Sequence, residues 1–154
     1  MQHFETKYFG NIAYEQESAI DFPLGLPGFE EERRFVAVEQ SFNKPIVFLQ
    51  SLGRPELCFI TLPIGRILPD YQGCLSPEEL KTLGLRDDVQ PAASGEMLWL
   101  GIVALAEEGQ ATINLLSPIV INWTTRRAVQ AVQADLDYSH RHPLFAKSPE
   151  TPCS

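Results

Sequence analysis

Cysteine is scarce in this sequence. Its 154 residues include three cysteines, Cys58, Cys74 and Cys153. They form neither a CxxC pair nor an even set, so they do not predict a disulfide framework or a zinc site. Reduced thiols in a cytoplasmic protein are the expected state.

Motifs of enzyme chemistry are missing as well. The histidines His3, His140 and His142 lie near the termini. The last two have no obvious third ligand, which favours a solvated tail over a metal fragment. Neither GxxxxGK[ST] nor GxGxxG occurs, and Ser117 lacks the context of a hydrolase nucleophile. We therefore expect no catalytic residue, no metal and no cofactor.

Positive charge is also limited. Twelve Lys and Arg residues stand against 20 Asp and Glu residues, which gives a net charge of −8. The longest basic runs are the pairs Arg33–Arg34 and Arg126–Arg127. Nucleic-acid binding relies on clustered cations, so direct binding of DNA or RNA is not expected. A basic protein partner suits this charge better.

Long hydrophobic runs are absent too. The longest strongly apolar run, residues 97–106, is about half of the roughly 20 residues that a membrane-spanning helix needs. The first seven residues lack the apolar region of a secretory signal. With 44% hydrophobic residues, the chain is expected to fold as one cytoplasmic domain, by default a monomer.

The sequence does contain many short β-branched and aromatic runs separated by Gly and Pro, a pattern typical of strands. A hairpin is predicted where residues 98–106 and 111–116 flank a loop that contains Gly109. So many strands in one domain favour closure, which removes exposed edges. The predicted fold class is mainly β, a small closed or nearly closed antiparallel β-barrel-like domain with one or two short helices. The expected strands are residues 4–9, 12–14, 18–22, 35–38, 46–52, 57–62, 97–106, 111–116, 119–123 and 128–132.

One segment carries the signals of a helix. Ser76 is a natural N-cap, Pro77 suits the first helical position, and Glu79 completes a capping box. Gly84 offers the left-handed residue that ends such a helix.

The C-terminal third is less clear. Residues 126–136 fit both a helix and a strand, and their β-branched residues favour the strand. Beyond His142-Pro143 the chain is polar and contains proline. The predicted domain is therefore residues 1–143, with a flexible tail at 144–154.

Residues 22–30, FPLGLPGFE, predict a rigid loop, because prolines and glycines restrict the backbone to defined turns. Its apolar side chains, Leu24, Leu26 and Phe29, either fold onto the core, which we prefer slightly, or form an interaction patch. The run Glu30-Glu31-Glu32 is either a solvated loop or an acidic rim that attracts a cationic partner. Both interpretations stay open.

Residues 117–122, SPIVIN, form a second segment of interest. Pro118 cannot donate a ladder hydrogen bond, so the strand that follows is predicted at a sheet edge or a bulge. An edge can accept a strand or a helix from a partner. A plain core strand is equally consistent with the pattern.

Five stretches in a fixed order carry a family resemblance: residues 6–10 (TKYFG), 22–29 (FPLGLPGF), 48–51 (FLQS), 58–60 (CFI) and 114–122 (NLLSPIVIN). Together they resemble the FliW flagellar assembly factors. The resemblance implies a small, non-enzymatic β-barrel-like protein of the bacterial cytoplasm that binds flagellin. It also implies binding to CsrA, a small basic RNA-binding dimer that represses translation.

The resemblance further implies a partner switch. Flagellin held in the cytoplasm would occupy the protein, and export of flagellin would release it to antagonise CsrA. The antagonist could cover the RNA site, or it could dock beside that site and repel phosphate. The candidate binding residues are Phe29, Glu30, Glu31 and Glu32 for CsrA, and Ile119, Ile121 and Asn122 for flagellin.

Two alternatives belong to other functional classes. One is a flavin-type oxidoreductase with a small-molecule site in the barrel, whose phosphate anchor would have to come from Arg54, Arg66 or Arg126–Arg127. The other is a flagellin chaperone without a regulatory role.

Overall fold

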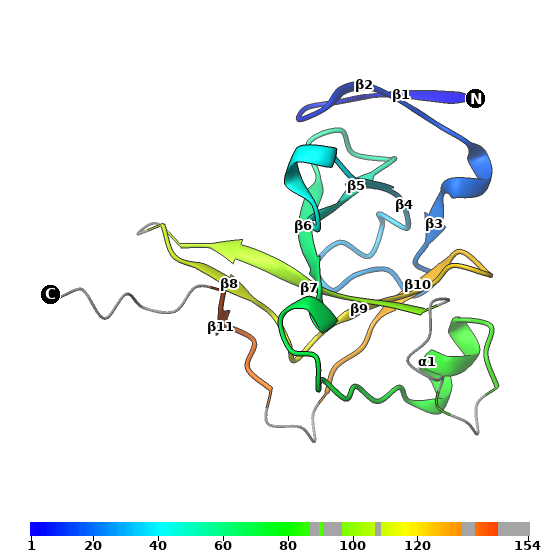
Figure 1. The fold of residues 1–154 in the computed structure, drawn as a ribbon. Helices are drawn as coiled ribbons and strands as arrows, with labels where there is room; N and C mark the ends of the chain where they lie inside the picture. Colours follow the sequence, from blue (N-terminus) through cyan, green and yellow to red (C-terminus); the bar gives the residue numbers. More distant parts are fainter. Residues whose placement is uncertain (87–89, 91–96, 107–108, 134–137, 145–154) are drawn as a thin grey trace, which may run out of the picture.

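Seven strands form a sheet that closes on itself into a barrel (Figure 1). The computed structural model describes residues 1–86, 90, 97–106, 109–133 and 138–144. Closure comes from β7, which pairs with β6 on one side and with β9 on the other. The barrel strands are β3 (Ile20–Asp21), β4 (Arg34–Val38), β5 (Val47–Ser51), β6 (Cys58–Pro63), β7 (Met97–Leu105), β9 (Ile119–Asn122) and β10 (Arg127–Gln130).

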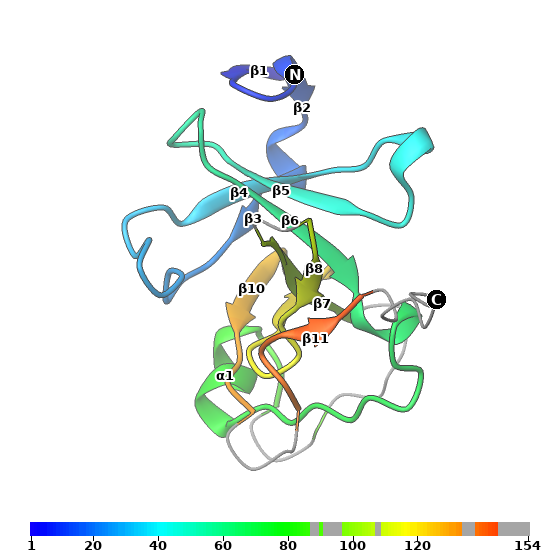
Figure 2. The ribbon, with the colours of Figure 1, turned by 90° about the vertical axis from the view of Figure 1, so that its left-hand side faces the viewer.

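Smaller elements surround the barrel (Figures 1 and 2). A separate hairpin of β1 (Gln2–Thr6) and β2 (Gly10–Tyr14) lies at the N-terminal end. Strands β8 (Ala111–Ile113) and β11 (His142–Pro143) extend the sheet beyond β7. The short helices are the 3₁₀ turns η1 (Gln16–Ser18), η2 (Ser41–Asn43) and η3 (Ile64–Arg66), and the helix α1 (Pro77–Thr82).

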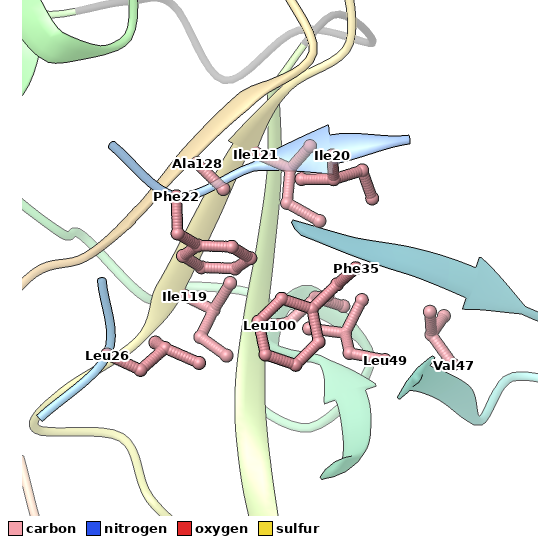
Figure 3. Packing of buried hydrophobic residues seen from close by; sticks show 10 residues of the cluster. All are labelled: Ile20, Phe22, Leu26, Phe35, Val47, Leu49, Leu100, Ile119, Ile121 and Ala128. Carbon is pink, nitrogen blue, oxygen red and sulfur yellow. The ribbon is translucent and has the colours of Figure 1, made fainter. Parts of the chain in front are cut away.

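Apolar side chains from most of the barrel strands fill the interior (Figure 3). The rings of Phe22 and Phe35 meet edge to face, with centroids 5.3 Å apart. This burial removes apolar surface from water and supplies the main stabilisation of the fold. The cluster consists of Ile20, Phe22, Leu26, Phe35, Val47, Leu49, Leu100, Ile119, Ile121 and Ala128.

The predicted helix is confirmed together with its cap. Ser76 Oγ accepts a hydrogen bond from the backbone N–H of Glu79, and the Glu79 carboxylate accepts one from the N–H of Ser76. Gly84, with φ +81°, follows the helix in the left-handed conformation. Leu80 and Leu83 are buried and attach α1 to the barrel.

Most of the predicted strands are confirmed, with some shifted ends. The first hairpin turns at residues 7–9 and not at residues 10–11, the gap between the two strands expected there, and Gly10 pairs with Thr6 inside the strands. The Thr6 hydroxyl closes this turn by accepting from the N–H of Phe9 and donating to the Gly10 carbonyl. The ambiguous segment forms a strand at Arg127–Gln130, while residues 134–136 lie outside the described residues. The barrel is antiparallel as predicted, except that β3 and β10 are parallel.

Of the two interpretations left open for the strand after Pro118, the plain core strand is confirmed and the edge strand is wrong. Strand β9 pairs with β10 on one side and with β7 on the other, and all four of its residues are buried. Closure of the barrel places β9 between two neighbours. Pro118 precedes the strand, so its missing N–H removes no ladder bond, and its carbonyl accepts from the N–H of Ala131 at 2.8 Å.

Candidate functional site

The loop at residues 22–33 is held in a defined shape by its own backbone. The N–H of Gly25 donates to the carbonyl of Phe22, and the N–H of Phe29 donates to the carbonyl of Leu26, both at 2.8 Å. Gly25 has φ +72°, and a Cβ there would lie 2.9 Å from the backbone of Glu30. Position 25 therefore requires glycine for both its conformation and its close contact.

Arg33 ties the two arms of this loop together. Its Nη1 donates to the carbonyl of Pro23 at 3.0 Å, and its Nε donates to the carbonyl of Glu30 at 3.2 Å. Hydrogen bonds from a charged donor are stronger than neutral ones, so they restrain the loop. These contacts account for the rigid loop that the prolines and glycines predict.

The apolar residues of the loop divide between the core and the surface. Leu26 is 2% exposed and belongs to the core cluster. Phe29 is half-buried, and its ring meets that of Phe59 edge to face at 5.5 Å. Leu24 is 52% exposed. The preferred interpretation, burial of these side chains, is correct for Leu26, partly correct for Phe29 and wrong for Leu24.

The three glutamates of the loop have different surroundings. Glu30 and Glu31 are exposed, whereas Glu32 is half-buried and accepts a hydrogen bond from Ser51 Oγ at 3.0 Å. The N–H of Gly28 donates to the Glu30 carboxylate and holds the pKa of Glu30 below its ordinary value. The exposed acidic rim is therefore Glu30 and Glu31, and Glu32 attaches the loop to β5.

A largely apolar groove borders the loop that carries the acidic rim, and we call it the rim groove. Its volume is about 250 Å³. The loop contributes Leu26 and Pro27 to the lining of the groove. The exposed Val132, from the segment after β10, also lines it. Negative charge and apolar surface thus share one loop. The lining residues are Leu26, Pro27, Phe59, Ile102, Ser117, Gln130 and Val132.

The residues predicted to contact flagellin are buried instead. Ile119 and Ile121 point into the barrel core and are 0% exposed, and Asn122 is 3% exposed. Asn122 Nδ2 donates to the Leu83 carbonyl, and its Oδ1 accepts from the N–H of Thr124. This side chain connects the barrel to the end of α1. A binding role for the three residues stays a prediction, without an exposed surface to support it.

A second groove, which the sequence pattern did not indicate, lies between the N-terminal hairpin and the barrel. This hairpin groove has a volume of about 390 Å³. Its aromatic content includes Phe9 and Phe48, whose ring centroids are 5.2 Å apart. Tyr8 on its border is 57% exposed, and Phe42, two residues after Gln40, is 79% exposed. The lining residues are Tyr8, Phe9, Gln40, Phe48, Cys58 and Ile60.

Cys58 in the hairpin groove is expected to be unreactive. Burial raises the pKa of its thiol to about 11, so little thiolate forms near neutral pH. Cys74 is exposed. Iodoacetamide at mildly alkaline pH should therefore alkylate Cys58 about tenfold more slowly than Cys74. Timed labelling followed by peptide mass mapping measures both rates, and equal rates would mean that the groove opens readily in solution.

Among the residues that the structure describes, packed side chains gather inside the barrel, which counts against the interior small-molecule site of the flavin-type alternative. Within the described part of the chain, no three His, Cys, Asp or Glu side chains gather as metal ligands would. None of the helices described is long and apolar enough to cross a membrane.

The family model described as "FliW protein" matches residues 3–144. This chain belongs to the FliW family. The match extends from β1 to Leu144, whose N–H still donates to the carbonyl of Ala111.

Relatives and a solved structure agree with this assignment to the FliW family. The chain is 35% identical over 150 residues to the flagellar assembly factor FliW of Desulfitobacterium hafniense, covering 96% of this chain and 95% of that protein. It is 31% identical over 137 residues to the flagellar assembly factor FliW of Syntrophomonas wolfei, covering 88% and 84%. A crystal structure of the flagellar assembly factor FliW superimposes with a TM-score of 0.83 at 28% identity, covering 96% of this chain and 99% of that one.

Proposed function

We propose that this FliW-family protein is a non-enzymatic flagellar assembly factor of the bacterial cytoplasm that binds flagellin and antagonises CsrA. The observation that supports this function is the family match over residues 3–144. The curated relatives carry the name flagellar assembly factor. We infer CsrA and flagellin as partners from the resemblance of the sequence motifs to this family.

For CsrA we propose the acidic rim and the rim groove as one docking surface. Glu30 and Glu31 are exposed and carry charge opposite to that of a basic RNA-binding dimer. The adjacent rim groove can accept an apolar side chain of the same partner. Phe29 packs against Phe59, which lines the rim groove, and so supports the groove wall. Glu32 contributes through its bond to Ser51, by holding the loop in place.

For flagellin we propose the hairpin groove in place of the buried strand β9. Concave apolar grooves with aromatic walls accept side chains from an extended or helical partner segment. Tyr8 on the border of the groove is exposed, so a partner segment could reach it there. Strand β6 contributes to both surfaces, since Phe59 lines the rim groove while Cys58 and Ile60 line the hairpin groove. Flagellin bound in the hairpin groove could therefore change the CsrA surface through β6, which contributes to both.

The overall charge of −8 favours a mechanism that acts by repulsion. An acidic protein docked beside the RNA site of CsrA would lower the affinity of CsrA for phosphate through its field. Such a mechanism does not require RNA and this protein to bind the same surface of CsrA. Excess RNA then overcomes the antagonist only in part, whereas a protein that covers the RNA site is displaced completely.

Calorimetric titration of the purified chain with flagellin and, separately, with CsrA tests the proposed function. Binding to both partners, each lost in the presence of the other, is the expected result. Binding to flagellin without binding to CsrA would leave a secretion chaperone and remove the regulatory role. Binding to neither partner would contradict the proposal as a whole.

A further inference from the structure

Two arginine pairs that lie far apart in the sequence meet at one end of the barrel. Strand β3 lies between β4 and β10, so Asp21 is opposite Arg34 on one side and Arg127 on the other (Figure 1). The N–H of Asp21 also donates to the carbonyl of Arg126 at 2.8 Å. Arg33 directly precedes β4. We call these four residues, Arg33, Arg34, Arg126 and Arg127, the arginine cluster.

The arginine cluster is a local exception in an acidic protein. It contains four of the 12 basic residues of a chain whose net charge is −8. Asp21 lies among them, and its Oδ1 is 3.6 Å from Arg34 Nε, but both side chains are about half exposed. An exposed pair of this kind contributes little to stability. Cations gathered on neighbouring strands repel one another, and a bound anion would relieve that repulsion.

A pocket of about 440 Å³ lies within this cluster, at the end of α1. Arg33 and Arg127 belong to its lining from different strand ends, and Thr82 lines it from the helix. Pro23 adds apolar surface, and Asp21 also belongs to the lining, so one carboxylate lies beside the two arginines. Two arginines, which outnumber the single carboxylate, and one proline therefore border one cavity.

Two of the arginines are already held by other contacts. The bonds of Arg33 to the carbonyls of Pro23 and Glu30 use two of its five N–H groups and fix its guanidinium. The guanidinium carbon of Arg126 lies 4.7 Å from the centre of the Trp123 ring, a cation–π contact. Arg33, which lines the pocket, therefore loses less conformational entropy when a ligand arrives, whereas Arg126 lies outside the lining.

We propose that this pocket binds a carboxylate side chain from an acidic, partly apolar segment of a protein partner. The guanidinium fork matches a carboxylate in geometry. Pro23 in the lining, with the exposed Leu24 next in the chain, suits an apolar residue beside that carboxylate. The overall negative charge opposes a long polyanion such as nucleic acid. This inference depends on neither CsrA nor flagellin.

The test is fluorescence anisotropy of the full chain with a labelled peptide of alternating glutamate and leucine at low salt. The wild-type protein should bind this peptide, and its affinity should fall as salt is added. Arg127→Glu should weaken binding about tenfold, and Arg127→Gln should weaken it less, because reversal adds repulsion to the lost attraction. Arg127 is exposed, so both variants are expected to fold, which a thermal melt verifies.

The matched control is Arg66→Glu, an exposed arginine in η3 that is not part of the pocket lining. It makes the same change in net charge and should leave peptide affinity unchanged. A peptide of alternating glutamine and leucine and a short uridine oligonucleotide serve as ligand controls. No binding of the glutamate peptide, equal binding by the Arg127→Glu variant, or tighter binding of either control ligand would overturn the proposal.

Discussion

Ile121→Ala is expected to lower the free energy of unfolding by about 2–5 kcal/mol, the range for truncating a large aliphatic side chain in a packed core. Ile121 is 0% exposed and packs inside the barrel with Ile20, Phe22 and Ile119. Strand β9 is paired on both sides, so it has little room to move into the cavity. Urea unfolding followed by circular dichroism measures the change.

The same variant separates a structural role from a binding role. Below its unfolding transition, Ile121→Ala should bind flagellin with wild-type affinity, because the side chain does not reach the surface. Val47→Ala, another truncation in the same core cluster but outside β9, is the matched control. If the folded Ile121→Ala protein binds flagellin more weakly and the control does not, β9 contributes to the flagellin surface.

Reversing both charges of the acidic rim, Glu30→Lys with Glu31→Lys, is expected to weaken binding to CsrA by about 10- to 100-fold at low salt. Both side chains are exposed, so the fold should be retained. The difference from wild type should shrink as salt is added, because ions screen exposed charges. Affinity measured by calorimetry at several salt concentrations gives both quantities.

The control for the rim variant is Glu15→Lys with Glu17→Lys, which changes the net charge equally at exposed positions in and before η1. Equal losses in both double variants would mean that the overall charge, and not the rim, controls association. Unchanged affinity of the rim variant would remove the loop from the CsrA surface. Glu32 is left intact, because its bond to Ser51 supports the loop.

The sequence predicted local structure well where the deciding interactions are local. The helix start at Ser76 depends on a capping box between residues three apart, and both of its hydrogen bonds are present. The loop at residues 22–33 follows from its prolines and glycines, whose conformational limits do not depend on the rest of the fold. The closed barrel followed from the number of short strands, because closure is a common solution for their edges.

The sequence could not predict features that depend on which strands become neighbours. Pro118 suggested an edge, yet closure placed β9 between β7 and β10. The pairs Arg33–Arg34 and Arg126–Arg127 appeared to be separate, and the parallel pairing of β3 with β10 brought them together. Both grooves and the arginine pocket likewise combine residues from distant segments, so no local motif marks them.

An RNA gel shift tests the central claim most directly. CsrA from the same organism is bound to the leader of its flagellin message, and this protein is titrated in, with and without flagellin. The account predicts that the protein releases the RNA and that added flagellin reverses the release. No release of RNA, by a protein that still binds flagellin, would contradict the proposed antagonism of CsrA.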